Sequence, residues 1–93
     1  MAITRYRSED GLFYGYVETF RVRPAGGTYN IVANYTAFGE HNVYIKMATC
    51  KTEKEAIERL NMIQALDGII EKYDLREYKE QMEKAEERAL ESL

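Results

Sequence analysis

The sequence of 93 residues predicts an α+β fold: a three-stranded antiparallel β-meander in the N-terminal half, covered by one long or broken C-terminal helix (two helical segments), in the order βββαα. Three runs rich in aromatic and β-branched residues, separated by turn residues, predict the strands. Helix-capping patterns at Thr52 and Asp74, each followed by apolar residues at helical spacing, predict the two segments. We expect residues 1–93 to form a single domain, with 1–50 as its β-sheet half and 51–93 as its helical half.

The predicted strands cover residues 12–23, 28–37 and 43–50. The sequence Pro-Ala-Gly-Gly at 24–27 predicts a hairpin turn, and residues 38–42 supply a second turn. Alternation gives the sheet one apolar face that needs a cover and one polar face that can meet water. In the first strand, one face is expected to carry Tyr14, Tyr16, Glu18, Phe20 and Val22, and the opposite face Arg21 and Arg23. In the second strand, one face carries Tyr29, Ile31, Ala33 and Tyr35, and the opposite face Asn30, Val32 and Asn34. In the third strand, one face carries Val43, Ile45 and Met47, and the opposite face Tyr44, Lys46 and Ala48.

The first helix is predicted to begin after Thr52, whose hydroxyl can accept from an early backbone N–H while Glu55 reaches back to the Thr52 N–H. We expect a break between Asp67 and Asp74, because one helix over 53–91 would be about 60 Å long and would overhang the domain. The apolar stripe placed on the sheet is Ala56, Ile57, Leu60, Ile63, Leu66 and Ile70, and a second, offset stripe is Met62, Ala65, Ile69 and Tyr73.

The last helix is predicted over about 75–91. Apolar and small side chains recur there at spacings of three and four on an otherwise charged rod, which is the pattern of a narrow coiled-coil seam. This seam could pack on the preceding helix or on the same helix of a second copy, so a homodimer is one hypothesis. The seam residues are Leu75, Tyr78, Met82, Ala85 and Ala89.

Charge is unevenly distributed along the chain. The net charge is −3, yet residues 1–50 carry five basic and four acidic side chains, while residues 51–93 carry eight basic and twelve acidic ones. A protein that holds DNA by phosphate neutralisation alone is normally basic overall, but a local basic face on the N-terminal half is compatible with these numbers. No signal-peptide run and no apolar stretch of 18 residues occurs, so we expect a cytoplasmic protein that does not span a membrane.

The residues that could carry chemistry are few. His41 is the only histidine and falls in the predicted 38–42 turn without an obvious nucleophile. Cys50 is the only cysteine, which excludes an intramolecular disulfide and leaves no partner for a zinc site or a CxxC motif. No phosphate-binding glycine motif is present. The sequence therefore predicts no catalytic residues, no metal, no cofactor and no enzymatic activity.

Two surfaces are candidates for binding. Eight tyrosines, six of them within residues 1–44, together with nearby arginines are typical of protein interfaces, although tyrosine is also a good strand former in a half-buried sheet. The polar face of the predicted sheet could instead contact nucleic acid. The protein-binding candidates are Arg5, Tyr6, Arg7, Tyr14 and Tyr16. The nucleic-acid candidates are Arg21, Arg23, Asn30, Asn34, Tyr44 and Lys46.

The order of three strands followed by a helix, with Lys51-Thr52-Glu53-Lys54-Glu55-Ala56 at the helix start, resembles the arm-type DNA-binding domains of phage integrases. The resemblance covers about residues 14–66. It implies a three-stranded sheet that contacts DNA through its polar face. The acidic C-terminal half departs from that family.

The leading functional hypothesis is a small non-enzymatic protein-binding module, an inhibitor or adaptor of the compact kind that phages and mobile elements encode. The first alternative is a nucleic-acid-binding domain that uses the polar sheet face. A further alternative is a structural component of a larger assembly, with the terminal helix as its docking element.

Overall fold

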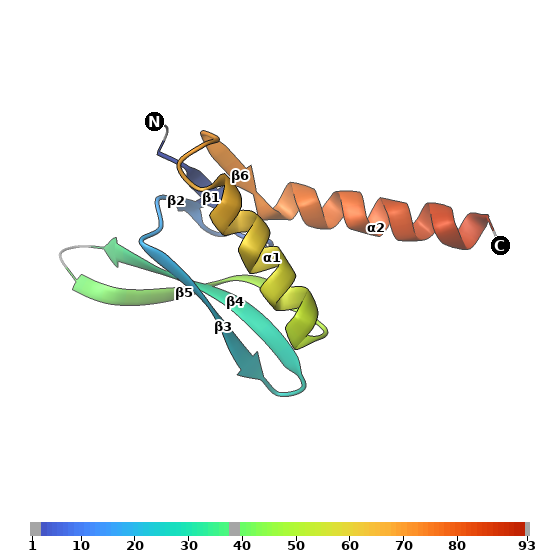
Figure 1. Cartoon of the computed structure of the whole chain (residues 1–93), viewed down its shortest axis with the longest axis horizontal. Coiled ribbons are helices and arrows are strands. Elements are labelled where there is room, and N and C mark those ends of the chain that lie inside the picture. Colours follow the sequence, from blue (N-terminus) through green and yellow to red (C-terminus); the bar gives the residue numbers. More distant parts are fainter. Residues whose placement is uncertain (1–2, 38–39, 93) are drawn as a thin grey trace.

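The computed structural model describes residues 3–37 and 40–92. Its strands form two three-stranded sheets, in the orders β2-β1-β6 and β3-β4-β5. The α+β class and the N-terminal meander are confirmed, whereas the order βββαα is wrong because three short strands were not foreseen. The elements are β1 (Arg5–Arg7), β2 (Tyr14–Gly15), β3 (Thr19–Ala25), β4 (Thr28–Ala37), β5 (Glu40–Cys50), α1 (Glu53–Leu66), β6 (Lys72–Asp74) and α2 (Leu75–Glu91) (Figure 1).

The larger sheet is the predicted meander, with β4 antiparallel to both β3 and β5. Its first turn is the expected hairpin: Gly26 and Gly27 have φ values of +56° and +93°, which glycine adopts readily and which suit a two-residue turn. β4 spans the predicted 28–37 range, and β5 begins at Glu40, three residues earlier than expected. The second predicted turn, over 38–42, falls in part outside the described residues.

The prediction of one strand over 12–23 is wrong, because the segment forms β2 and β3 in different sheets. The reason lies in the position of its apolar side chains. Phe13 and Val17 pack against the core from odd positions, whereas Phe20 and Val22 do so from even positions. A single regular strand cannot turn both sets toward one core, since alternate side chains point to opposite faces.

A β-bulge in β5 changes the predicted faces of its C-terminal end. Ile31 is paired with Ala48 and Val32 with Lys46, so Met47 is an extra residue on β5. Beyond such a bulge the alternation of side chains is reversed. Met47 and Ala48 are therefore both buried, at 0% and 1% exposure, and the prediction that Ala48 lies on the polar face is wrong.

Helix α1 begins at the predicted capping residue. Thr52 Oγ1 accepts a hydrogen bond from the Glu55 N–H at 3.1 Å. The returning bond differs from the expected one, because Glu55 Oε2 accepts from the N–H of Lys51 at 3.3 Å instead of from that of Thr52. The sequence pattern therefore located the helix start correctly and missed only the second partner.

Helix α1 covers the larger sheet with a narrower stripe than predicted (Figure 1). Ala56 and Ile63 are fully buried, and Leu60 packs against the same core. Ile57 is 44% exposed, so its assignment to the buried stripe is wrong. The second stripe is mostly on the surface: Met62 is 47% exposed, while Tyr73 is half-buried against the core.

The predicted break between the helices is confirmed, and it contains an unforeseen strand. Helix α1 ends at Leu66, and Gly68 turns the chain with a φ of +78°. β6 then pairs in parallel with β1, from Arg5 opposite Lys72 to Arg7 opposite Asp74. The Arg5 N–H donates to the Glu71 carbonyl at 2.9 Å at the start of this ladder.

Three side-chain hydrogen bonds connect the N-terminal segment to the end of α1. Thr4 Oγ1 donates to the Ile70 carbonyl at 2.5 Å and accepts from the Gly68 N–H at 3.0 Å. Tyr6 Oη donates to Asp67 Oδ1 at 2.6 Å. Thr4 and Tyr6 are only 4% and 1% exposed, so these bonds satisfy polar groups that water cannot reach well.

Helix α2 starts as predicted and then leaves the body of the protein. Asp74 is its N-cap and accepts from the Glu77 N–H at 3.1 Å, and Leu75 is fully buried. From Lys79 to Ser92 every residue is exposed, and the helix projects away from both sheets (Figure 1). The prediction that both helical segments cover the sheet is therefore wrong for α2, whose surface is charged on all but one narrow side.

Leu75 attaches α2 to the core, and this role predicts an asymmetry between two leucines of the same helix. Leu75→Ala should lower the free energy of unfolding by about 2–5 kcal/mol, because it leaves a cavity in the core. Leu90 is 70% exposed, so Leu90→Ala should change it by less than about 0.5 kcal/mol. Urea unfolding followed by circular dichroism measures both values, and equal effects would contradict the described position of Leu75.

Candidate binding surfaces

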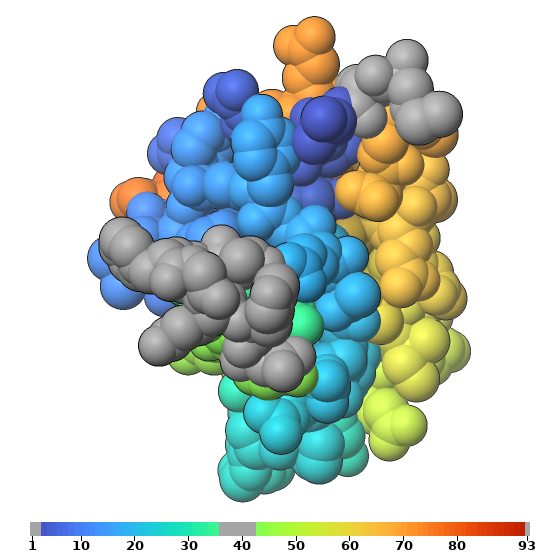
Figure 2. Space-filling view, turned by 90° about the vertical axis from the view of Figure 1, so that its left-hand side faces the viewer, coloured from blue at the N-terminus to red at the C-terminus, as the bar shows by residue number. Residues whose placement is uncertain are grey.

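The small sheet presents cations and tyrosines on its outer side. Because side chains alternate along β1, Arg5 and Arg7 point outward while Tyr6 between them enters the core. We call the outer group the Arg–Tyr surface. In Figure 2, which views the side away from α2, the blue N-terminal residues of this region lie above the cyan β3. The Arg–Tyr surface consists of Arg5, Arg7, Tyr14, Tyr16 and Lys72.

Each cation of the Arg–Tyr surface lies over a tyrosine ring. The guanidinium carbon of Arg5 is 5.2 Å from the centroid of Tyr16, and that of Arg7 is 5.4 Å from the centroid of Tyr14. Lys72 Nζ lies 5.8 Å from the Tyr14 centroid. Arg5 Nε also donates to Tyr16 Oη at 2.9 Å, and this bond raises the pKa of Arg5. These contacts hold long side chains in place before any partner arrives.

Asp74 is the acidic neighbour of this surface. Its Oδ2 lies 3.4 Å from Arg7 Nε and 3.8 Å from Lys72 Nζ, and its side chain is 12% exposed. The same carboxylate caps α2. Three cations therefore face solvent beside one mostly buried carboxylate, and the Arg–Tyr surface is locally positive.

Four of the five predicted protein-binding residues lie together, and the fifth does not. Tyr6 is 1% exposed, and burial together with its bond to Asp67 raises the pKa of its hydroxyl, which stays a neutral donor. Its assignment to a binding surface is wrong. Lys72 was missed because β6 was not predicted. The short Ile-Ile-Glu-Lys-Tyr run at 69–73, between Gly68 and the capping Asp74, was the available signal.

The polar face of the larger sheet is the second surface, which we call the sheet face. The strand register places Arg21, Val32 and Lys46 in one row across it and Arg23 beside Asn30 in the next. All six predicted nucleic-acid candidates lie on this face, with the two asparagines half-buried between the more exposed cations. The residues of the sheet face are Arg21, Arg23, Asn30, Asn34, Tyr44 and Lys46.

Tyr44 of β5 is the aromatic residue that both arginines of the sheet face contact. Arg21 Nη2 donates to Tyr44 Oη at 2.9 Å, and the guanidinium carbons of Arg21 and Arg23 are 5.0 and 5.7 Å from its ring centroid. Tyr44 is itself 40% exposed. Within 19–34 and 44–49, the positions that share this face carry no carboxylate. The arrangement is a positively charged, partly aromatic sheet surface.

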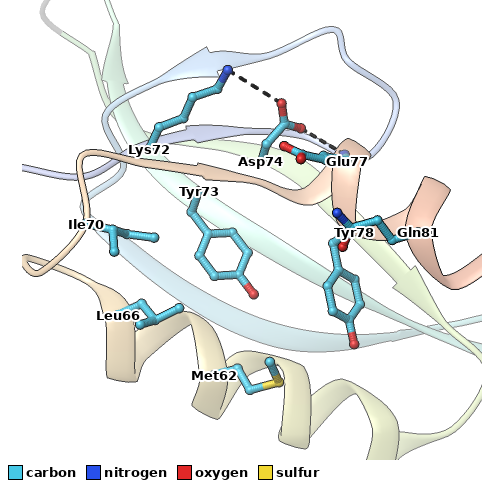
Figure 3. Close-up of a pocket in the computed structure, with 9 residues that line it drawn as sticks. All are labelled: Met62, Leu66, Ile70, Lys72, Tyr73, Asp74, Glu77, Tyr78 and Gln81. Atoms are coloured by element: carbon cyan, nitrogen blue, oxygen red, sulfur yellow. Dashed lines mark hydrogen bonds and ion pairs between the residues drawn. The ribbon is translucent and has the colours of Figure 1, made fainter.

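An apolar hollow separates the two helices, and we call it the α1–α2 groove. One part, of about 300 Å³, lies between Met62 and Leu66 of α1 and the rings of Tyr73 and Tyr78, as Figure 3 shows. An adjoining part, of about 360 Å³, continues along both helices to Met82. The groove is open to solvent. Its first part is mainly apolar, whereas the part that runs to Met82 is also lined by Glu55, Glu58, Arg59 and Lys79.

Arg59 lines the groove and contacts both α2 and the N-terminal segment. Its guanidinium carbon lies 4.7 Å from the ring centroid of Tyr78, and its Nη1 is 3.4 Å from Glu9 Oε2. Lys79 Nζ approaches the other oxygen of the same carboxylate at 3.7 Å. These contacts join the first turns of α2 to α1 and to the N-terminal segment.

The five predicted seam residues of α2 have different environments. Leu75 is buried in the core of its own chain, so its assignment to a seam with a second copy is wrong. Tyr78 is half-buried and lines the groove, whereas Met82 is 47% exposed. Ala85 and Ala89 are exposed, as is every residue from Lys79 to Ser92.

Of the two residues singled out for chemistry, the structure describes the side chain of Cys50. Cys50 is 1% exposed, and burial raises the pKa of its thiol, against the opposing effect of Arg59 Nη1 at 3.8 Å. The His41 side chain lies outside the described part of the structure. Among the described residues, no group of three or more His, Cys, Asp or Glu side chains is placed to hold a metal ion. Nor does any described helix have the length and apolarity needed to cross a membrane.

Comparison of the chain with protein-family models, with curated proteins and with solved structures finds no match.

Proposed function

We propose that the chain is a non-enzymatic module that binds another protein through the Arg–Tyr surface. The observation that carries this proposal is the stacking of Arg5 and Arg7 on Tyr16 and Tyr14, two rings that are 51% and 47% exposed. Tyrosine and arginine are the residue types that most often supply large binding energies at protein interfaces. The proposed role is that of an inhibitor or adaptor, which acts by occupying a surface of its partner.

The chemistry of the Arg–Tyr surface also indicates what kind of partner surface fits. Arg5, Arg7 and Lys72 are cationic, so acidic side chains on the partner complement them and steer the encounter. The tyrosines give apolar contact area at a small cost in side-chain entropy, because each has two rotatable bonds. Since the guanidinium groups are already held over the rings, binding requires little further ordering. The expected partner surface is therefore acidic, with apolar patches.

If the Arg–Tyr surface binds another protein, Tyr14→Ala combined with Tyr16→Ala should abolish binding of that protein. Truncation of two interface anchors typically costs about 2 kcal/mol or more, which corresponds to at least a roughly thirtyfold loss of affinity. The measurement is quantitative affinity capture from an extract of the native host, using tagged protein and mass spectrometry. A protein enriched by the wild-type chain should be depleted in the double variant.

A matched control comes from the other sheet. Arg21→Ala combined with Arg23→Ala removes two exposed cations that also contact a tyrosine, but on the sheet face. This variant should recover the partner at the wild-type level. If the tyrosine variant retains the partner, or both variants lose it equally, the Arg–Tyr surface is not the binding site.

The sheet face favours a second candidate function, binding of nucleic acid. Arg21 and Arg23 both contact the exposed Tyr44, on a face whose strand positions within 19–34 and 44–49 lack carboxylates. Arginines beside an aromatic ring suit phosphate contact and base stacking. The chain's acidity does not oppose this, because α2 holds six glutamates and projects away from the sheets. The arm-type resemblance agrees with this use of the face: β3, β4, β5 and α1 follow one another in the implied order.

This second candidate predicts salt-dependent binding to mixed-sequence DNA. Each phosphate contact contributes about 0.9 to the slope of log affinity against log salt, so Arg21→Ala with Arg23→Ala should reduce the slope by about two. Fluorescence anisotropy with labelled DNA, at salt concentrations between about 50 and 200 mM, measures this slope. Arg5→Ala with Arg7→Ala is the matched control and should leave the slope unchanged. Absence of wild-type binding, or an equal loss in the control, would refute a nucleic-acid role for this face.

A further inference from the structure

Helix α2 carries an apolar stripe whose first residue, Tyr78, stacks on Arg59 of α1 and whose other residues are exposed. Tyr78, Met82, Ala85 and Ala89 recur at spacings of four, three and four, so they share one side of the helix. The α1–α2 groove opens along that side, because Tyr78 and Met82 line it. Stripe and groove are therefore continuous through Tyr78 and Met82, with charged side chains of both helices beside them.

Large and small side chains occupy different halves of the stripe. Its N-terminal half carries the large side chains of Tyr78 and Met82, and its C-terminal half carries only Ala85 and Ala89. In an antiparallel pair of α2 helices, Tyr78 would meet Ala89 of the second copy and Met82 would meet its Ala85. Large side chains then fill the space left by small ones, as close packing requires. A parallel pair would instead place alanine against alanine and tyrosine against tyrosine.

Charge at the flanks of the stripe selects the same orientation. Lys79 and Glu86 lie on the same flank, seven residues apart, at equivalent positions of two successive heptads. In the antiparallel register set by the size pattern, Lys79 of one copy lies beside Glu86 of the other, and the symmetry generates this ion pair twice. In a parallel pair, Glu86 would instead face Gln81, which carries no charge.

We infer that two copies of the chain associate through antiparallel α2 helices, each placing the alanine half of its helix in the α1–α2 groove of the other. The occupant of the groove is thus a second copy of this chain. The pairing covers the exposed Met62 and Met82, which are each 47% exposed in the single chain. At about 25 Å, the length of α2 is sufficient to reach across the partner's groove. This inference is independent of the proposed function, since it uses neither the Arg–Tyr surface nor the sheet face.

The test is the mass of the protein in solution, by light scattering on a sizing column over a range of concentrations. The wild-type chain should elute at twice its 10.9 kDa chain mass at high concentration. Ala85→Arg places a long cation in the centre of the interface at a position exposed in the single chain, and it should give a folded monomer. Circular dichroism of the variant verifies that the fold is retained.

A charge exchange tests the orientation. Glu86→Lys should weaken the dimer by about tenfold, because it turns two attractive pairs into repulsive ones. Lys79→Glu should weaken it similarly, and the double exchange should restore it. Lys79 also lies 3.7 Å from Glu9 of its own chain, so circular dichroism checks that both variants keep the fold. Glu87→Lys is the matched control, since it makes the same charge change on the adjacent residue, which faces away from the stripe, and it should leave the dimer intact.

Each of three results would overturn the inference: a wild-type chain that remains at 10.9 kDa at every concentration, a dimer that persists in Ala85→Arg, or a double exchange no tighter than the single ones. The first two exclude pairing through α2. The third excludes the antiparallel arrangement.

Discussion

The parallel pairing of β1 with β6 is the contact on which the rest of the architecture depends. It joins a segment near the N-terminus to the chain between the two helices, and the Arg5 N–H bonded to the Glu71 carbonyl begins the ladder. Thr4 and Tyr6 add buried hydrogen bonds to the same stretch. Because buried polar groups are costly when unpaired, these bonds favour one position of the segment over its alternatives.

Both the Arg–Tyr surface and the direction of α2 follow from this pairing. β6 brings Lys72 beside Tyr14 and places Asp74 where it pairs with Arg7 and also caps α2. Leu75 follows at once and is buried, so the start of α2 is fixed against the core while its remainder extends into solvent. One short strand thus assembles a cationic surface and orients a helix whose apolar stripe is exposed beyond Tyr78.

The sequence predicted most of the parts governed by local chemistry. Thr52 and Asp74 were recognisable as helix starts because capping depends on residues only three positions apart. Gly26 and Gly27 marked the hairpin because few other residues adopt positive φ there. The clean alternation of β4 likewise gave its bounds and faces. These features need no knowledge of distant contacts.

The features that were missed depend on contacts between distant segments. β6 is three residues long and pairs with a strand more than sixty residues earlier, so no local period reveals it. The bulge at Met47 reverses a face without any glycine to mark it. Tyr6 resembled a surface residue by its position between Arg5 and Arg7, but its ring packs on Phe20 and Tyr73 in the core and its hydroxyl bonds to Asp67. The binding surfaces were therefore predicted in residue type but not in full membership.

Amide hydrogen exchange at Arg5, followed by NMR, tests the central pairing most directly. Arg5 is the first residue of β1, and its N–H donates to the Glu71 carbonyl, which is within reach only if β6 pairs with β1. The structure predicts that this amide exchanges far more slowly than the same amide in an unfolded peptide. Exchange of the Arg5 amide at the rate of an unfolded peptide, while the β4 amides stay protected, would show that the β1–β6 ladder does not form in solution.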